Sequence, residues 1–196
     1  MKLLHLDSSI MGEGSASRAI SAAVVERLRE TQPGLDVSYR DLAAEPLAHM
    51  TLETFLALDT GEDVQQFLDA DIVVIGAGFY NFSIPSQLKA WVDRIAVRGK
   101  TFSYGETGPV GLATGKRVII ALARGNVYGA DSPYAAYEHA ETLLRSIFTF
   151  VGADVEFVVA EGLGRGEDAR RIAIDGALAQ AGRLSQNAAA PAAASV

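Results

Sequence analysis

The feature that most limits what this chain can fold into is an alternation of two kinds of segment. Short apolar runs alternate with segments whose apolar residues repeat at helical spacing. Two apolar runs, residues 72–75 and 118–122, are continuous, which is typical of strands buried on both faces of a parallel sheet. Between them, Leu88, Trp91 and Ile95 repeat at the spacing of one helical face. We therefore predict an α/β fold in which helices join parallel strands. The five predicted strands cover residues 3–6, 37–40, 72–75, 117–122 and 155–159.

The connections between these strands predict their order in the sheet. Right-handed crossovers suit a three-layer sandwich with the order 2-1-3-4-5 and helices over both faces. The sequence shows no repeat and no internal boundary, so we predict a single domain over residues 1–184. The alanine-rich residues 185–196 are predicted to be a disordered tail. The glycine-rich residues 100–115 are predicted to form a long loop, and residues 134–151 a helix.

Composition and charge exclude several classes of function. The formal net charge of −7 gives an acidic surface that repels phosphate backbones, so nucleic acid is not expected as a partner. The chain has no cysteine, which excludes disulfides and thiolate chemistry and fits a reducing cytoplasm, the location we predict. No apolar run approaches the roughly 20 residues of a membrane span. The three histidines lack metal-ligand spacing, so no metal site is predicted, and the acidic residues are interpreted as lying on solvated faces.

The segment after the first strand, residues 7–18, has the composition of an anion-binding loop. Its serines offer hydroxyl groups, and the helix that follows begins with free N–H groups and the positive end of its dipole. The pattern Gly12-x-Gly14-x-x-Ser17 is close to a dinucleotide-binding fingerprint, with Asp41 near the position of a ribose-binding acid. The glycines come several residues after the strand, however, so a single phosphate suits the loop better. Serines are also common helix caps, and this alternative stays open for the loop alone.

Two further loops follow the third and fourth predicted strands. Residues 79–82, Phe-Tyr-Asn-Phe, place an amide between aromatic rings, which suits a flat heteroaromatic ligand with a hydrogen-bonding edge. Residues 123–126, Ala-Arg-Gly-Asn, put a glycine where backbone can approach a ligand closely. Each loop alone could be a buried turn. In the predicted strand order the three loops meet at one edge of the sheet, where open α/β folds bind ligands, so together they predict a phosphate site beside a ring site.

A series of short motifs occurs in order along residues 3–184. The motifs include Asp7-Ser8-Ser9, Ser15-x-Ser17, Arg40-Asp41-Leu42, Tyr80-Asn81-Phe82-x-Ile84-Pro85, Gly99-x-Thr101-Phe102-x-Tyr104, Gly108-Pro109-x-Gly111-Leu112 and Ala160-Glu161-Gly162. Together they resemble the FMN-dependent NADH:quinone oxidoreductases, also called azoreductases, which have a flavodoxin-like fold.

The resemblance implies a homodimeric flavoenzyme with one FMN per subunit. It implies that NADH or NADPH gives electrons to the flavin, and that a quinone or azo compound then takes them in the same pocket. The flavin carries the chemistry, so no catalytic side chain is expected. The implied FMN contacts are Ser9, Ser15, Ala16 and Ser17 for the phosphate, Phe79, Tyr80, Asn81 and Phe82 for the ring, and Ala123, Arg124, Gly125 and Asn126 for its pyrimidine edge. The implied substrate pocket contains Tyr104, Tyr128 and Phe150.

The chain departs from the family pattern in the third loop. The family often has Ser-Arg-Gly-Gly followed by a histidine, whereas this chain has Ala123 and Asn126 at the outer positions and Tyr128 in place of the histidine. These changes bear on substrate preference more than on flavin binding, because the backbone N–H groups remain. Two alternatives stay open: an NADPH-dependent FMN or chromate reductase, and a flavodoxin-type electron carrier without a substrate of its own.

Overall fold

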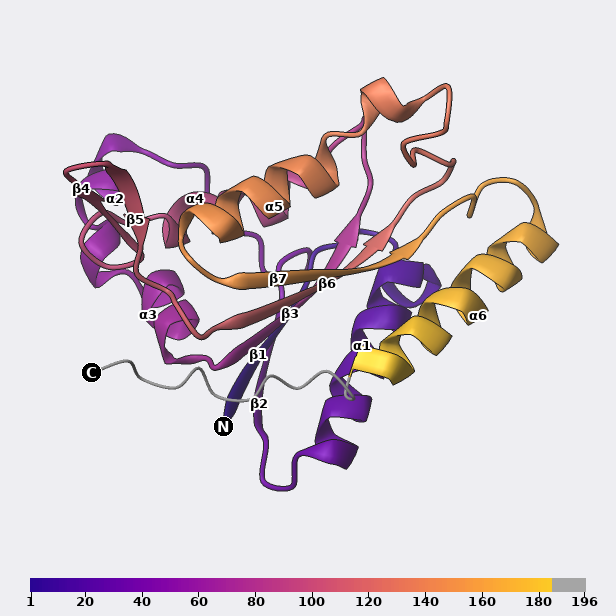
Figure 1. Ribbon diagram of the computed structural model, residues 1–196, viewed down its shortest axis with the longest axis horizontal. Helices are drawn as coiled ribbons and strands as arrows, with labels where there is room; N and C mark the ends of the chain where they lie inside the picture. The colour runs from indigo at the N-terminus through magenta and orange to yellow at the C-terminus, as the bar shows by residue number, and fades with distance from the viewer. Residues whose placement is uncertain (185–196) are drawn as a thin grey trace.

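A central sheet of five strands carries helices on both faces (Figure 1). The computed structural model describes residues 1–184, and the tail predicted for residues 185–196 lies outside them. The strands of the sheet are β1 (Lys2–Asp7), β2 (Asp36–Asp41), β3 (Ile72–Gly78), β6 (Arg117–Ala123) and β7 (Asp154–Ala160). The helices are α1 (Ala16–Thr31), α2 (Leu52–Leu56), α3 (Glu62–Asp69), α4 (Ser86–Ile95), α5 (Ala140–Phe150) and α6 (Glu167–Leu184).

The sheet has the order β2-β1-β3-β6-β7, and every neighbouring pair is parallel. The predicted α/β fold with a five-stranded parallel sheet is confirmed. The predicted order 2-1-3-4-5 needs correction, because by strand number the observed order is 2-1-3-6-7. Two strands that the sequence did not indicate, β4 (Phe102–Gly105) and β5 (Gly108–Gly111), precede the last two strands of the sheet and form a separate antiparallel hairpin.

Alternate residues of the inner strands face opposite layers. In β3, Val73 and Ile75 pack in one core with residues of α3, α4 and α5. Ile72 and Val74 pack in a second core with residues of α1 and α6. Both faces of the strand are therefore covered, which explains why its sequence shows no polar alternation. Trp91 of α4 is fully buried in the first core.

The hairpin replaces the loop predicted for residues 100–115. Its strands pair from Phe102 with Gly111 to Gly105 with Gly108. A Cβ on Gly111 would be 2.3 Å from the backbone nitrogen of Gly152, so no side chain fits there. The glycine at this position lets two backbones pack closely. The prediction of a long loop from the glycine content of residues 100–115 is therefore wrong.

The helix predicted over residues 134–151 begins later, at Ala140. The Glu138 carboxylate accepts hydrogen bonds from the N–H groups of Ala140, Glu141 and Thr142 at 3.0, 2.8 and 3.2 Å. It thereby satisfies the donors at the start of α5. The residues before it form a short 3₁₀ turn, Ala135–Tyr137.

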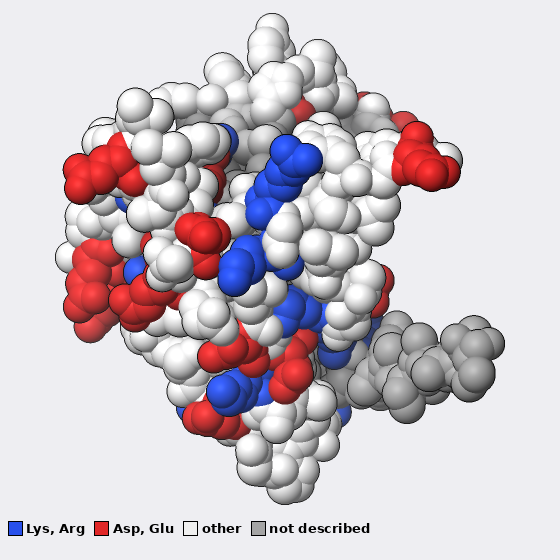
Figure 2. Space-filling view, turned by 90° about the vertical axis from the view of Figure 1, so that its left-hand side faces the viewer, with Lys and Arg blue, Asp and Glu red and all other residues white. Residues whose placement is uncertain are grey.

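The hairpin and the carboxyl ends of the sheet strands lie at opposite ends of the molecule (Figure 1). On the face at the hairpin end, acidic and basic side chains are interspersed (Figure 2). Within residues 1–184, no helix combines the length and the hydropathy needed to cross a membrane.

Candidate functional site

A crevice opens where β1, β3, β6 and β7 end. Because β1, β3 and β6 are neighbours in the sheet, the three loops that follow them meet there. The crevice has a volume of about 280 Å³. It is lined by Ser9, Met11, Gly14, Ser15, Ala16, Ser17, Gly78, Phe79, Tyr80, Ala123, Gly125, Leu163, Gly164 and Arg170.

Most of the residues predicted to contact FMN line this crevice, and four do not. Asn81, Phe82, Arg124 and Asn126 lie outside its lining. Among residues 1–184 the structure contains no group of three or more side chains placed to hold a metal ion. The crevice is built from hydroxyl groups, backbone and aromatic rings, with one arginine.

The first loop ends at the N-cap of α1, which is Ser15. Its backbone is extended, with φ −79° and ψ 121°, and its hydroxyl accepts a hydrogen bond from the N–H of Arg18 at 3.3 Å. The same hydroxyl lies 3.1 Å from that of Ser17. The N–H groups of Ala16 and Ser17 belong to the first turn, where the helix itself provides no carbonyl for them. Ser15 is thus a helix cap, and the hydroxyls, free amides and helix dipole at this point can bind an anion.

Arg18 holds the other end of the first loop. Its Nε and Nη2 donate to the carbonyl oxygen of Ser9 at 3.1 and 2.8 Å. Its Nη1 and Nη2 donate to the two carboxylate oxygens of Asp41, each at 2.7 Å. The hydrogen bond from Arg18 lowers the pKa of Asp41, and the same bond raises the pKa of Arg18. Asp41 is therefore engaged in fixing the loop, which disfavours a ribose-binding role for it.

Buried polar groups form a hydrogen-bond network around Asp7, at the start of the first loop. Asp7 accepts hydrogen bonds from the hydroxyls of Ser21 at 2.8 Å and Tyr39 at 3.2 Å, and His5 Nε2 lies 3.1 Å from the Ser21 hydroxyl. A Cβ on Gly76 would be 2.1 Å from Asp7 Oδ1, so the glycine makes room for this carboxylate. The interpretation that the acidic residues lie on solvated faces is wrong for Asp7, which is 4% exposed and compensated by hydroxyl donors.

The second loop is a two-residue turn between Tyr80 and Ser83. These residues exchange backbone hydrogen bonds of 2.9 and 3.0 Å. Asn81 and Phe82 between them have φ of 47° and 72°, the geometry of a type I′ turn. The turn exposes both of these side chains, whereas the Tyr80 hydroxyl lies 3.0 Å from the hydroxyl of Ser9. Tyr80 thus links the second loop to the first across the crevice.

Arg124 of the third loop is enclosed by three carboxylates. Its guanidinium nitrogens lie 2.7 Å from Glu161, 2.8 Å from Glu141 and 3.1 Å from Glu138, and the residue is 3% exposed. Burial raises the pKa of Glu141, but hydrogen bonds from Arg145 and Arg124 outweigh it, so the pKa is lowered. The arginine side chain therefore ties the loop to β7 and α5. For these three glutamates too, the expectation of solvated positions is wrong.

Backbone hydrogen bonds join the third loop to the segment after β7. The carbonyls of residues 124–126 accept from the N–H groups of residues 162–164 at 2.8 to 3.2 Å. This pairing brings Leu163 and Gly164 to the crevice, and Arg170 follows in the first turn of α6. None of these three residues was predicted from the sequence, although the rule that ligands bind at the carboxyl ends of strands also applies to the fifth strand.

The predicted aromatic pocket residues lie in two separate places. Tyr128 packs on Phe79 with ring centroids 4.6 Å apart. The Phe102 ring contacts Tyr104 of the hairpin and Phe150 at the end of α5, with centroids 5.7 and 4.7 Å apart. Within one chain, this second group lies at the hairpin end, opposite the carboxyl ends of the sheet strands (Figure 1).

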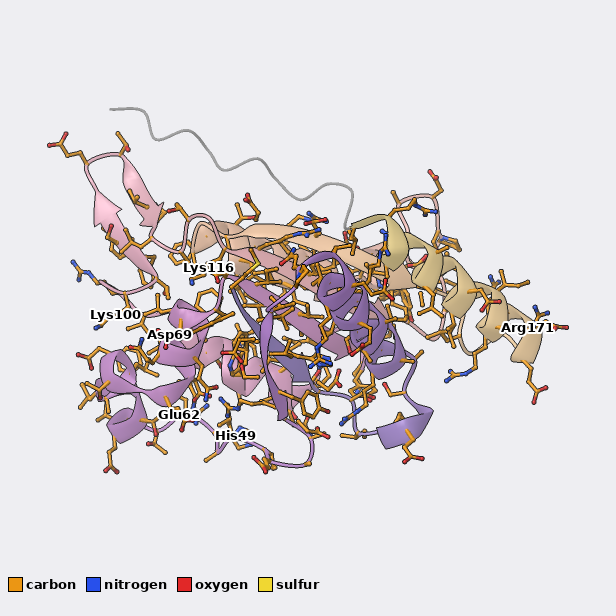
Figure 3. All side chains as sticks on the ribbon, turned by 90° about the horizontal axis from the view of Figure 1, so that it is seen from below. His49, Glu62, Asp69, Lys100, Lys116 and Arg171 are labelled. Carbon is orange, nitrogen blue, oxygen red and sulfur yellow. The ribbon has the colours of Figure 1, made fainter. Side chains whose placement is uncertain are left out.

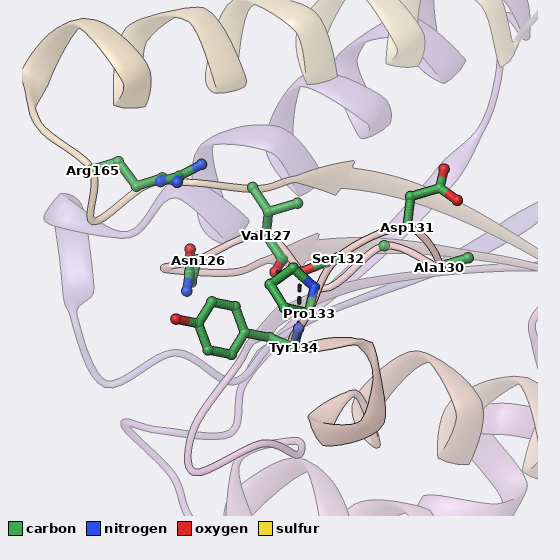
Figure 4. Close-up of a pocket in the computed structure, with 9 residues that line it drawn as sticks. Asn126, Val127, Ala130, Asp131, Ser132, Pro133, Tyr134 and Arg165 are labelled. Carbon is green, nitrogen blue, oxygen red and sulfur yellow. Dashed lines mark hydrogen bonds between the residues drawn. The ribbon is translucent and has the colours of Figure 1, made fainter.

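A second hollow, with a volume of about 390 Å³, lies beyond the third loop (Figure 4). Asn126, Tyr134 and Arg165 border it, and the Ser132 hydroxyl accepts from the N–H of Tyr134 at 3.1 Å. The lining of this hollow includes none of the residues that line the crevice. The structure thus assigns the Asn126 side chain to the second hollow and Gly125 to the crevice.

Comparison with known proteins gives a consistent result. A family model described as "Flavodoxin-like fold" matches residues 1–184. "FMN-dependent NADH:quinone oxidoreductase 2" of Bradyrhizobium diazoefficiens is 53% identical over 199 residues, covering 94% of this chain and 98% of that protein. "FMN-dependent NADH:quinone oxidoreductase" of Stenotrophomonas maltophilia is 55% identical over 186 residues, covering 91% and 93%. Among solved structures, an azoreductase from Bacillus anthracis superposes with a TM-score of 0.87 at 28% identity, covering 95% of this chain and 99% of that chain.

Proposed function

The chain belongs to the flavodoxin-like family of FMN-dependent NADH:quinone oxidoreductases, and from this premise we propose that its crevice binds FMN and that the protein passes electrons from NADH to quinones and azo compounds. One observation carries the proposal. The anion-binding start of α1 and the aromatic second loop share a single crevice, joined where the Ser9 and Tyr80 hydroxyls lie 3.0 Å apart. FMN combines a phosphate with a flat ring, and the crevice offers a place for each.

The residues of the crevice fit this cofactor. Ser15, Ala16 and Ser17 offer hydroxyl and amide donors to the phosphate. Phe79 and Tyr80 give the ring an aromatic wall. A Cβ on Gly125 would meet no atom within 4 Å, so the backbone there is open to an approaching ring edge.

When bound, FMN supplies hydride chemistry that side chains cannot perform. The contribution of the protein is binding, orientation and electrostatics. Apart from Arg170, no charged residue among the described ones lines the crevice, so its walls offer no carboxylate or imidazole for general acid–base catalysis. Tyr128 packs on Phe79 and extends the apolar wall on which a flat donor or acceptor can stack in turn.

We infer that the working unit is a homodimer. Tyr128 packs on Phe79, which lines the crevice, whereas Tyr104 and Phe150 lie at the other end of the same chain, so a pocket that contains all three needs two copies. A groove of about 330 Å³ runs beside α4 and α5 between these ends. We propose that a two-fold axis lies across this groove and brings the hairpin of one copy to the crevice of the other. Exposed apolar side chains occur at both ends, namely Leu52, Phe55, Leu56 and Tyr104 at one and Phe82, Tyr134 and Tyr137 at the other.

Stopped-flow absorbance tests the proposal. The purified protein is expected to be yellow, to release FMN and not FAD on denaturation, and to lose its flavin absorbance on mixing with NADH. Addition of a quinone should restore the absorbance, and NADPH in a parallel experiment defines the donor preference. A flavin that NADH alone fails to reduce would identify an electron carrier. Light scattering gives the mass, and a monomer would contradict the dimer.

A further inference from the structure

Arg170 connects α6 to the first loop across the mouth of the crevice. Its Nη2 donates to the carbonyl oxygen of Gly14 at 2.8 Å, a contact between residues 156 positions apart in the chain. Arg170 also lines the crevice beside the serines of that loop. This arginine was not among the residues that the sequence indicated.

Arg170 is the only charged residue among the described residues that line the crevice. The other polar groups there are hydroxyls and backbone amides, which offer dipoles but no full charge. A phosphate monoester carries close to two negative charges near neutral pH, with a second pKa of about 6. In a chain of formal net charge −7, a local cation would offset the general repulsion that a phosphate meets and would add to the attraction of the helix start.

The charge of Arg170 is not neutralised by a carboxylate. Within residues 1–184 the structure gives it no ion pair, and its side-chain contact is with the neutral carbonyl of Gly14. Two other arginines of the crevice loops are paired with carboxylates. Arg18 is paired bidentately with Asp41, and Arg124 is enclosed by three glutamates. A guanidinium has five N–H donors, so Arg170 keeps several after its contact with Gly14.

The position of Arg170 in α6 also points to a role outside the helix. Residue 170 lies at the start of α6, where the helix dipole disfavours a cation. Glu167 and Asp168 in the same turn offset the dipole, and the latter pairs with the neighbouring Arg171 at 2.9 Å. The stability of α6 therefore does not explain why Arg170, which faces the crevice, is an arginine.

We propose that Arg170 binds the phosphate of FMN through its free N–H groups, while its Nη2 holds the first loop at Gly14. The proposal rests on the function proposed above. The first loop is then fixed by two guanidinium groups with different tasks. Arg18 anchors Ser9 and is charge-compensated, whereas Arg170 anchors Gly14 and brings a free charge to the ligand.

Flavin affinities of Arg170→Gln test the proposal. The apo-protein is titrated with FMN and with riboflavin, which has the same ring and no phosphate, and binding is followed by quenching of flavin fluorescence. The variant should bind FMN about tenfold or more weakly, the scale of one charge-assisted hydrogen bond, and riboflavin within about twofold of wild type. Arg171→Gln is the matched control, because Arg171 is exposed and lies at the outer end of α6 (Figure 3).

A second measurement separates direct contact from an effect through Gly14. The second pKa of the bound phosphate, followed by ³¹P NMR, should be lower in wild type than in Arg170→Gln, because a nearby cation favours the dianion. Arg170→Lys should keep most of this difference. Equal FMN affinity in wild type and Arg170→Gln, an equal loss for FMN and riboflavin, or an unchanged phosphate pKa would each overturn the proposal. If wild type itself binds no FMN, the proposed function fails instead.

Discussion

The ion pair of Arg18 and Asp41 fixes the geometry of the crevice at the residue scale. Two parallel hydrogen bonds hold the carboxylate, and the same guanidinium holds the Ser9 carbonyl. Both side chains are largely buried, at 17% and 24% exposed, so solvent screens the pair less than it screens a surface pair. The pair thus contributes both to stability and to the shape of the first loop.

We expect Asp41→Asn to reduce stability in a pH-dependent way. The bonds from Arg18 hold the pKa of Asp41 below its ordinary value of 3.8. A carboxyl whose folded pKa is lowered stabilises the fold above the unfolded pKa, and this contribution is lost as pH falls through the folded pKa. Urea denaturation near neutral pH should show a loss of about 1–2 kcal/mol.

The difference between Asp41→Asn and wild type should shrink as pH falls from 3.8 through the lowered pKa of folded Asp41, because the protonated aspartate, like asparagine, carries no charge. Asp168→Asn is the control, since its surface pair with Arg171 and its place in the first turn of α6 should together contribute less than the largely buried pair of Asp41. A pH-independent difference for Asp41→Asn would contradict the assignment.

Residue roles that depend on local sequence could be predicted, and those that depend on pairing between distant strands could not. Ser15 and Ser17 were placed at the crevice because a helix start is a local feature. The pairing of Asp41 with Arg18 could not be predicted, because the two residues are brought together only by the parallel register of β1 and β2. The carboxylates around the Arg124 side chain could not be predicted, since nothing local indicates that Glu138 and Glu161 converge on it.

At the element scale, the turn that closes the second loop depends on residues tolerating positive φ. Asn81 adopts φ 47°, which asparagine accepts more readily than other residues with a side chain. Asn81→Val should lower the free energy of unfolding by about 1–2 kcal/mol, because a β-branched residue is strained there. Asn81→Gly should leave it nearly unchanged. Equal effects of the two substitutions in thermal or urea denaturation would show that the turn does not hold this geometry.

Close packing of β3 against the first loop gives a second prediction at this scale. Gly76→Ala should destabilise the protein by about 1–3 kcal/mol, since the new Cβ would be 2.1 Å from Asp7 Oδ1 and 2.9 Å from Ser21 Oγ. Gly176→Ala is the matched control. In α6 its Cβ meets no atom within 4 Å, so alanine should stabilise the helix by about 0.5–1 kcal/mol. Urea denaturation that gave both variants the same sign would refute this account.

The sequence predicted the elements that carry strong periodicity and missed those defined by packing. Continuous apolar runs marked β3 and β6, because both faces of these strands are buried. The β4–β5 hairpin was not predicted, because its glycines indicate a loop unless the contact with the Gly152 backbone is known. The late start of α5 depends on a glutamate, Glu138, which is not a common capping residue.

At the scale of the whole molecule, the aromatic residues predicted for one pocket lie at two ends of the chain. Tyr128 accompanies Phe79 at the crevice, and Tyr104 lies on the hairpin, where 61% of it is exposed. The sequence pattern of one chain does not show which of these residues meet, because the proposed contact joins two copies. The proposed dimer therefore makes each site depend on both subunits, and this dependence can be measured.

Complementation between two defective variants measures it. Gly125→Trp should fill the crevice without unfolding the chain, since no atom lies within 4 Å of a Cβ there. Tyr104→Glu, at an exposed position, should remove the contribution of the hairpin to the substrate pocket. In a co-expressed mixture, half of the dimers are mixed and one of their two sites combines an intact crevice with an intact hairpin, so about a quarter of wild-type quinone reduction should return. Co-expressed Gly125→Trp and Gly125→Tyr share the same defect and should recover none. If the first mixture shows only the summed activity of its parents, each site is built within one chain.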